Sequence, residues 1–350
     1  MDLMTRPRSG QKCLEYVLMF NKTTGSSKVP YLMIDPWTKK RLFPKVNSIE
    51  LFPVNDLVGY KTVVLGNCLY VLGGKRWNTG EYVNTVWKYD PYSSNWTRCR
   101  PMSLARTRFS ADILDKKIYC VGGEVSGGHV TDTVEYYEPL KDEWSEACSL
   151  PSPRVDHASC VVRNRLYISG GIRKIKHQCS AVFLVYDFDV DAWSDPITDI
   201  ELPQEREKHT MVPIGGRHIF FFGGRGFDQD NFKEKDEAKV CSFDCRKRVL
   251  SKHDPCWDKS HPNMFHPRSN AGQIVLGKQI YLIGGKNFSK DHDVRTVEYY
   301  DVKRRKWRET FQLPEGISYV NVDCCILKVP TCNRDFNSAD LYLYDKWLLW

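Results

Sequence analysis

The sequence predicts an all-β protein built from one repeated unit, and two observations lead to that prediction. The first is a short apolar run that ends in two glycines, as in Ile118–Gly123. Such a run is too short for a helix and indicates a buried strand that stops abruptly. The second is the segment Thr133–Tyr137, in which polar and apolar residues alternate as they do in a half-buried strand. Glycine suits the end of the first strand because such turns often need a positive φ.

This unit occurs five times in register. Its glycine pairs are Gly73-Gly74, Gly122-Gly123, Gly170-Gly171, Gly223-Gly224 and Gly284-Gly285. An aromatic residue follows each pair, at Tyr89, Tyr137, Tyr186, Phe243 and Tyr300. In four copies a tryptophan lies 21 or 22 residues after the second glycine, at Trp96, Trp144, Trp193 and Trp307, and we place Leu250 at this position in the fourth copy. Features kept in register over five copies indicate a structural repeat of about 50 residues.

A sixth unit is divided between the two ends of the chain. Leu14–Phe20 resembles the strand before the glycine pair, and Tyr31–Pro36 matches the alternating strand, with Arg41 where tryptophan is expected. In the later copies a further strand, which we call the leading strand, precedes the strand that ends in the glycine pair, as in Tyr60–Leu65 and Ser110–Leu114. The first unit lacks this leading strand, and Ile317–Leu327 is a candidate for it. We therefore predict six blades of four antiparallel strands, with the C-terminal strand completing the first blade. Ring closure removes open sheet edges that would otherwise promote aggregation.

Together these features resemble the kelch repeat. The resemblance is carried by the apolar strand, the glycine pair, the turn Tyr89-Asp90-Pro91 and a tryptophan six residues after the acidic position, as in Asp90 to Trp96. It implies a six-bladed kelch β-propeller. Residues 1–13 are then a linker remnant, residues 14–330 form the propeller, and residues 331–350 form an apolar C-terminal tail packed on the propeller or on a partner.

The composition of the chain indicates what kind of protein it is and what kind of partner it binds. Of its 350 residues, 41% are hydrophobic, which supplies a large core, and no apolar run approaches the ~20 residues of a membrane span. The thirteen cysteines are odd in number and scattered, so we interpret them as reduced core residues, which favours a cytoplasmic location with the nucleus as a second option. The net charge of +8 is modest, and it favours an acidic protein surface over nucleic acid or a membrane as partner.

The loops that enter the innermost strands are the first candidate binding site, because kelch adaptors bind partners on one rim of the propeller. Counting fourteen residues back from the first glycine of each pair gives Gly59, Arg108, Asp156, His209 and Asn270. Arginine occurs two residues earlier in three copies, as Arg106, Arg154 and Arg268. An arginine ring would suit carboxylate, phosphate or carbonyl recognition because its planar fork donates paired hydrogen bonds. The alternative is that these arginines pair within or between blades.

The loops after the glycine pairs are the second candidate. They contain Lys75-Arg76-Trp77, His129, Arg173-Lys174, Lys176, Arg225 and Lys286. A tryptophan beside cations has the composition of an interface hot spot, where truncation costs ~2 kcal/mol or more. Solvated loop charge is the alternative for any single lysine. We single out Arg76 and Trp77, and we expect a ligand of acidic or carbonyl-rich character with an aromatic or apolar anchor near Trp77.

Catalysis, a metal and a cofactor are not expected. The residues Cys241, Cys245, His253, Cys256, His261 and His266 include zinc-ligand types, but their spacing matches no recognised zinc site. Some propellers similar to kelch are enzymes, yet the histidines here do not recur at equivalent positions. No phosphate-loop pattern follows the glycine pairs, so we interpret these glycines as structural.

The resemblance also implies protein recognition as the function. In BTB-kelch proteins the kelch rim captures a substrate peptide or degron and the BTB region binds a cullin. The chain therefore looks like the non-catalytic, substrate-binding part of a cullin-RING ubiquitin ligase adaptor. Thr5–Arg8 is similar to the junction that follows the helical region in such proteins, although no BTB or BACK-like region precedes it in this sequence. The alternative is a scaffold for actin or other cytoskeletal proteins, which other kelch proteins bind.

Overall fold

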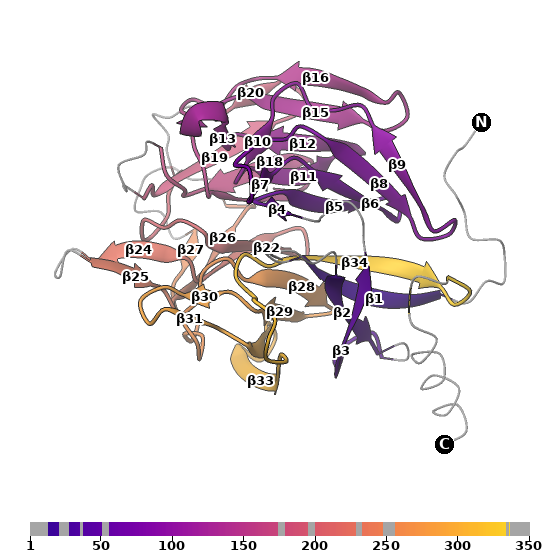
Figure 1. Ribbon diagram of the computed structural model, residues 1–350. Helices are drawn as coiled ribbons and strands as arrows, with labels where there is room; N and C mark the ends of the chain where they lie inside the picture. Colours follow the sequence, from indigo (N-terminus) through magenta and orange to yellow (C-terminus); the bar gives the residue numbers. More distant parts are fainter. Residues whose placement is uncertain are drawn as a thin grey trace.

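The computed structural model describes residues 13–20, 28–35, 38–50, 56–173, 179–194, 200–228, 233–247, 256–333 and 336. Within these residues, six sheets each contain a path of four antiparallel strands (Figure 1). We number these sheets as blades 1 to 6 in chain order. Their innermost strands contact one another in one closed cycle, β34, β5, β11, β17, β22, β28 and back to β34. The predicted fold class, an all-β propeller, is confirmed, and the cycle of six sheets agrees with the predicted number of blades.

The strands of each blade run from the centre of the ring outwards. Blade 1 consists of β34 (Asp323–Pro330), β1 (Cys13–Phe20), β2 (Lys28–Ile34) and β3 (Leu42–Glu50). Blade 2 consists of β5 (Lys61–Leu65), β6 (Cys68–Leu72), β8 (Val86–Asp90) and β9 (Asn95–Cys99). Blade 3 consists of β11 (Ser110–Leu114), β12 (Lys117–Val121), β15 (Val134–Glu138) and β16 (Glu143–Ala147).

The other three blades follow the same order. Blade 4 consists of β17 (Ala158–Val162), β18 (Arg165–Ser169), β19 (Val182–Asp187) and β20 (Ala192–Trp193), and β21 (Ile200–Glu201) also pairs with β19. Blade 5 consists of β22 (Thr210–Ile214), β23 (His218–Phe222), β26 (Val240–Asp244) and β27 (Trp257–Asp258). Blade 6 consists of β28 (Gly272–Leu276), β29 (Gln279–Ile283), β32 (Thr296–Asp301) and β33 (Lys306–Gln312).

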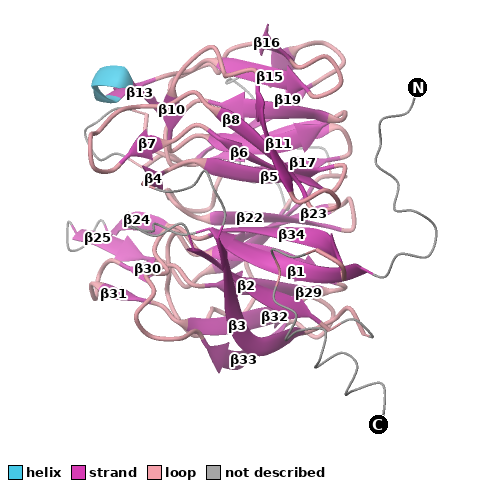
Figure 2. Cartoon of the chain, turned by 45° about the vertical axis from the view of Figure 1, so that its right-hand side comes forward, coloured by secondary structure: helices cyan, strands magenta, loops and turns pink. Residues whose placement is uncertain are grey.

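Short extra strands gather on one side of the disc, at the left of Figure 2. They are β4 (Leu57–Val58) with β7 (Lys75–Arg76), β10 (Arg106–Thr107) with β13 (Glu124–Val125) and β14 (His129–Val130), β24 (Arg225–Asp228) with β25 (Lys233–Asp236), and β30 (Lys286–Asn287) with β31 (His292–Asp293). Each set includes a loop that follows a glycine pair. We call this side the rim. The turns from first to second strand in blades 2 to 6, and from third to fourth strand in all six blades, lie on the opposite face, because antiparallel strands reverse direction at every turn.

The two ends of the propeller meet in blade 1. Strand β34 pairs antiparallel with β1 over its whole length, from Cys13 opposite Pro330 to Phe20 opposite Asp323. Asp323 also joins blade 1 to blade 2, because its Oδ2 accepts hydrogen bonds from the N–H and hydroxyl of Thr62, both at 3.0 Å. The sequence placed the leading strand at residues 317–327. The strand itself begins six residues later, at Asp323, and ends at Pro330.

The repeated aromatic pair stabilises each blade near its outer edge. Tyr89, Tyr137, Tyr186 and Tyr300 each lie across from their tryptophan with ring centroids 5.0–5.2 Å apart. In blade 5 the same arrangement joins Phe243 to Trp257, again at 5.2 Å. The assignment of Leu250 to the tryptophan position was therefore wrong. The turn between β26 and β27 is longer than its counterparts, which moves the tryptophan seven places along the chain, and Leu250 itself lies outside the described residues.

The hydrophobic core lies mainly between blades. Tyr70 and Leu72 of blade 2, for example, pack with Phe109 and Ile118 of blade 3 in one buried cluster. The start of the predicted tail also packs on the propeller, since the buried Phe336 stacks on Tyr16 with ring centroids 4.9 Å apart. Residues 334–335 and 337–350 lie outside the described residues. Across the described ranges, no helix has the length and apolarity needed to cross a membrane.

Candidate functional site: the rim around the central ring

Six loop positions surround the centre of the rim, one at the entry to each innermost strand. All six have a positive φ between 51° and 63°, and they are Gly59, Arg108, Asp156, Lys208, Asn270 and Asn321. Backbone hydrogen bonds of 2.8–3.2 Å connect neighbouring blades there, from Arg108 N–H to Gly59 C=O, Asp156 to Arg108, Lys208 to Asp156, Asn270 to Lys208, and Val322 to Asn270. We call these positions the central ring. Their geometry is fixed by the backbone, so the side chains are free to vary.

The blade 5 member of this ring is Lys208, and the sequence-based choice of His209 was wrong by one residue. Blade 5 joins its first two strands through three residues, Gly215–Arg217, whereas the turns at Gly66-Asn67 and Asp115-Lys116 have two. A count of fourteen from the glycine pair therefore ends one position late. His209 is buried, and its Nε2 lies 2.7 Å from the Ser169 hydroxyl. Burial lowers the pKa of His209, so the neutral form is favoured.

The arginines that precede the ring are buried and connect neighbouring blades. Arg106, Arg154 and Arg268 are each 1% exposed, so the exposed arginine ring expected from the sequence is not formed by them. Each side chain donates to the carbonyl of the first glycine of its own blade: Arg106 to Gly122 at 2.9 Å, Arg154 to Gly170 at 3.3 Å and Arg268 to Gly284 at 2.9 Å. Their own carbonyls accept from the second glycine of the preceding blade, at Gly74, Gly123 and Gly224.

A fourth arginine of this kind, Arg206, was missed by the sequence analysis for the same reason as Lys208. It is 2% exposed and donates to the Gly223 carbonyl at 3.1 Å. In blades 3 and 6 the equivalent guanidinium also forms a buried ion pair, Arg106 with Glu135 and Arg268 with Glu298, both at 2.8 Å. The strand register places Leu184 and Cys241 at the equivalent positions of blades 4 and 5. These four arginines therefore stabilise the scaffold rather than face a partner.

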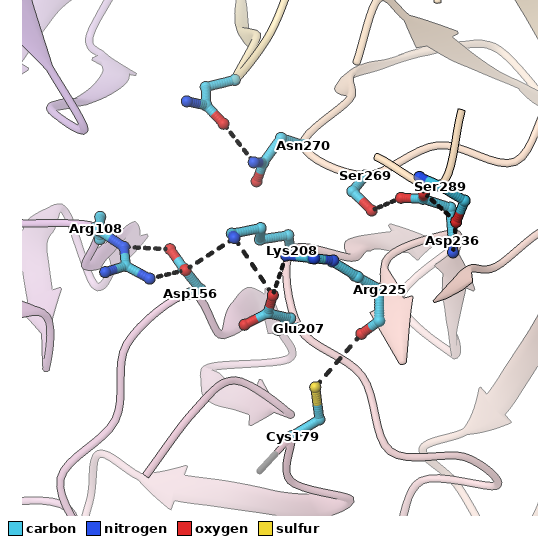
Figure 3. Close-up of polar contacts among 11 residues, drawn as sticks. Arg108, Asp156, Cys179, Glu207, Lys208, Arg225, Asp236, Ser269, Asn270 and Ser289 are labelled. Carbon is cyan, nitrogen blue, oxygen red and sulfur yellow. Dashed lines mark hydrogen bonds and ion pairs between the residues drawn. The ribbon is translucent and has the colours of Figure 1, made fainter. Parts of the chain in front are cut away.

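Arg108 is the one sequence-predicted arginine of the central ring, and the structure places it in a charged network that crosses the rim (Figure 3). Its guanidinium pairs with both oxygens of Asp156 and with Glu124, the latter at 2.7 Å. Burial alone would lower the pKa of Arg108, but the hydrogen bonds that its guanidinium donates to Asp156 and Glu124, and the charges of these acids, raise the pKa overall. The network continues through Lys208, whose Nζ lies 3.6 Å from Asp156 and 3.3 Å from Glu207.

Arg108 is the most exposed member of this network, while Lys208 and Glu124 are equally exposed at 17%. The Arg108 side chain is 36% exposed, whereas Asp156 and Glu207 are 9% and 5% exposed. Asp156 and Glu207 are therefore less accessible than Arg108 and Lys208, and they orient these two cations. The central ring therefore exposes the guanidinium of Arg108 to solvent, but Asp156 and Glu124 neutralise most of its charge.

A second group of cations surrounds one aromatic ring on the blade 5 and blade 6 side. Lys208, Arg225 and Lys286 come from three different loops, and their charged groups lie 5.3, 4.9 and 5.2 Å from the centroid of the Phe288 ring. We call Lys208, Arg225, Lys286 and Phe288 the cation cluster. Cations at this distance from a ring face are attracted by its quadrupole. Three carboxylates lie near these cations: Glu207, 3.8 Å from Arg225 and 3.3 Å from Lys208; Asp156, 3.6 Å from Lys208; and the exposed Asp291, 2.6 Å from Lys286.

The loop that carries Phe288 is held by a buried carboxylate. Asp236 is 4% exposed, and its Oδ2 accepts from the N–H and hydroxyl of Ser289 at 2.7 and 2.9 Å. Its other oxygen accepts from the Ser269 hydroxyl at 2.7 Å (Figure 3). Ser269 precedes the ring position Asn270, whose amide bonds to the side chain of Asn321. The cation cluster is therefore positioned in advance of any ligand.

Arg76 and Trp77 lie at the other end of the rim, on blade 2. The Trp77 side chain is 47% exposed, and its indole N–H donates to Asp56 at 3.1 Å. Arg76 is also exposed and pairs with Glu81 at 3.3 Å. The neighbouring Lys75 bonds to Tyr82, whose hydroxyl in turn donates to Glu124. Glu124 is also a partner of Arg108. Polar contacts therefore run across the rim, from Lys75 beside Trp77 to Lys208 of the cation cluster.

The zinc-ligand types noted in the sequence are dispersed in the structure. Cys241 and Cys256 are buried in one apolar cluster with Phe183, while His261 lies 2.9 Å from the Ser242 hydroxyl. His266 pairs with the exposed Glu309, and His253 lies outside the described residues. In the described part of the chain, no group of three or more histidine, cysteine, aspartate or glutamate side chains is arranged to hold a metal ion.

Two family descriptions match most of this architecture. The KLHDC2/KLHL20/DRC7 Kelch-repeats domain matches residues 108–318, and the Kelch motif matches residues 57–103. Kelch-like protein 26 from Danio rerio is 29% identical over 319 residues, which cover 90% of this chain and 49% of that protein. Kelch-like protein 21 from Mus musculus is 37% identical over 265 residues, which cover 75% of this chain and 38% of that protein. The chain thus spans half or less of the length of these relatives.

A solved structure shows the same fold at low sequence identity. The structure of YjhT superimposes with a TM-score of 0.68 at 14% identity, covering 84% of this chain and 94% of the other. At this identity the likeness concerns the fold alone.

Proposed function

This chain belongs to the kelch-repeat family, and from that premise we propose that its rim captures a segment of a partner protein. The observation that carries the proposal is the arrangement of the rim. A backbone ring locked across the blades presents one exposed aromatic anchor, Trp77, and a cation cluster around Phe288. Interfaces are enriched in tryptophan and arginine anchors of this kind.

The chemistry of the rim favours a ligand with an acidic side chain and an apolar one. The carboxylate would lie over Lys208 and Lys286, beside the Phe288 ring, where Asp156 and Glu207 are each shared between two cations. The apolar side chain would pack against Trp77, on the other side of the ring. Arg108 would contribute mainly backbone position and orientation, because Asp156 and Glu124 already hold its guanidinium.

We further propose that the chain acts in this way as the substrate receptor of a cullin-RING ubiquitin ligase adaptor, without catalysis of its own. Kelch-like proteins 26 and 21 support this reading by family relationship. The propeller would hold the substrate, and the ligase would supply the chemistry through a BTB region. The chain covers only part of those relatives, so the cullin contact is a proposal about the longer product.

Peptide selection on the purified chain tests the rim proposal. A displayed library of random peptides should enrich sequences that combine an acidic and an apolar residue. Fluorescence polarisation then compares the wild type with Trp77→Ala plus Lys286→Ala, which should weaken binding about tenfold or more. The matched control is Leu140→Ala plus Lys116→Ala, which removes one exposed apolar and one lysine side chain from blade 3.

The outcomes separate the alternatives. Loss of binding in the rim variant alone, with an unchanged unfolding temperature, supports the rim. Equal binding by all three proteins, or no enriched peptide, would refute it. Co-precipitation of a cullin with the full-length product would support the adaptor role, whereas co-sedimentation with actin filaments would favour a cytoskeletal scaffold instead.

A further inference from the structure

The face opposite the rim carries a concentration of positive charge over three adjacent blades. Ten exposed cations lie in the turns of blades 1, 5 and 6, and we call them the basic crescent: Lys39, Lys40, Arg41, Arg217, Arg246, Lys247, Lys278, Lys303, Arg304 and Arg305. The corresponding turns of blades 3 and 4 differ, since three cations there are offset by four acids, and the turns also hold the exposed Leu140 and Val190: the turns are Asp115-Lys116, Pro139–Asp142, Arg163-Asn164 and Phe188–Asp191. The charge is therefore localised rather than spread evenly over this face.

Contacts between blades show that the crescent is continuous. The Arg305 guanidinium of blade 6 donates to Asp258 at 3.1 Å and to the Ser260 hydroxyl at 2.7 Å, and both residues belong to blade 5. On its other side, the Tyr281 hydroxyl of blade 6 donates to the Lys40 carbonyl of blade 1 at 3.2 Å. The stem of Lys40 lies against Gly277, in the turn that also holds Lys278. The three sets of turns thus form one surface.

Three arginines of the crescent are oriented by buried carboxylates. Arg41 pairs with Asp35 at 2.7 Å, Arg217 with Asp244 at 2.7 Å and Arg304 with Asp301 at 3.3 Å. The three acids are 1%, 7% and 11% exposed, whereas the arginines are 45–66% exposed. The acid therefore holds one edge of each guanidinium and leaves the rest facing solvent. A guanidinium held in this way offers directed donors to an incoming carboxylate with little further loss of side-chain freedom.

From this arrangement we propose that the basic crescent is a second docking surface, which binds an acidic segment of a partner protein independently of the rim. A nucleic acid duplex gains most from uncompensated charge along its phosphates, whereas these arginines are already partly compensated. Single strands bind by stacking on aromatic side chains. The exposed large apolar residues of the described chain are Trp77, Leu104, Leu140, Val190 and Phe265, and the crescent contains none of them. Carboxylates on a polypeptide match the surface better.

Charge reversal at three lysines tests the proposal. Lys40, Lys278 and Lys303 form no side-chain ion pair among the described residues, so Lys40→Glu, Lys278→Glu and Lys303→Glu together should leave the fold intact. The control triple, Arg98→Glu, Lys116→Glu and Lys141→Glu, changes the net charge equally on blades 2 and 3. A labelled oligoglutamate peptide should bind the wild type and the control similarly, and the crescent triple about tenfold more weakly or worse.

Further probes decide between partners. The rim variant with Trp77→Ala and Lys286→Ala should retain oligoglutamate binding, which separates this surface from the rim. Equal losses in the crescent and control triples would mean that only net charge matters, and would overturn the proposal. It would also be overturned if a DNA duplex or vesicles containing phosphatidylserine bound through the crescent more tightly than the peptide, or if the peptide did not bind.

Discussion

Replacing Glu298 by glutamine should destabilise the propeller by about 3–5 kcal/mol, because it leaves a buried guanidinium without its carboxylate. Arg268 and Glu298 are 1% and 0% exposed, and their charged groups are 2.8 Å apart, so solvent screens the pair very little. The second oxygen of Glu298 accepts from the Phe265 N–H at 3.2 Å. Glutamine has nearly the same side-chain volume as glutamate, so the loss of stability would measure the lost charge and hydrogen bonding and not the cost of a cavity.

The variant should still fold, which makes the loss measurable. Blade 5 places Arg206 near Cys241, at the position that Glu298 has in blade 6, and the propeller accommodates that arrangement. With an unfolding entropy of about 2.1 cal/mol/K per residue, a loss of 3–5 kcal/mol corresponds to roughly 4–7 °C in unfolding temperature. Thermal and urea unfolding followed by circular dichroism give the value.

Glu146→Gln is the matched control, because it removes one carboxylate from an exposed strand position. We expect it to change the stability by less than about 0.5 kcal/mol. If Glu298→Gln lowered the free energy of unfolding by less than about 1 kcal/mol, or by no more than the control does, the Arg268–Glu298 pair would not contribute to stability in this way.

Three other predictions follow from the fold. His209→Ala should cost about 1–3 kcal/mol because the ring is buried against Ser169, whereas Lys208→Ala should leave thermal unfolding almost unchanged; equal effects would contradict the one-residue shift. Burial raises the pKa of Asp112 to about 6, so its protonated form favours folding, and this contribution is complete below about pH 4 and lost as the pH rises through about 6. Asp112→Asn should therefore be more stable than the wild type near pH 7 by about 1 kcal/mol, allowing for partial solvent access, and the gain should disappear near pH 4 in urea titrations. Deleting residues 317–350 removes β34 and leaves the inner edge of β1 without a neighbouring strand, so the product should aggregate on size exclusion; a monomer with wild-type circular dichroism would refute the role of closure.

The blades could be predicted from the sequence because their signals are local. A glycine pair, a tyrosine and a tryptophan at fixed spacing each reflect contacts within one blade, as the pairing of Tyr137 with Trp144 shows. The split blade was also predictable, since Leu14–Phe20 and residues 317–327 were each incomplete alone. Fixed spacing failed only where turns lengthen, at Gly215–Arg217 and before Trp257. The extra residue in the Gly215–Arg217 turn and the tryptophan at Trp257 were the signals in the sequence that could have revealed these longer turns.

The rim was less predictable because its geometry depends on contacts between blades. Nothing local to Arg154 indicates that its side chain reaches back to the Gly170 carbonyl and is buried. A clue did exist for Arg106 and Arg268, because a glutamate recurs in the second half of their blades, at Glu135 and Glu298. The cation cluster brings together residues 208, 225, 286 and 288, which only the closed ring places side by side.

The central ring has a consequence for how such a protein diversifies. Its six entry loops are joined by main-chain hydrogen bonds, so mutation can change the ligand-facing groups without altering the framework that displays them. The left-handed backbone sets one restriction, since glycine, asparagine and aspartate adopt it most readily and β-branched residues resist it. New specificities should therefore arise by exchange among unbranched side chains at these sites, while Arg106 and its counterparts stay constant beneath them.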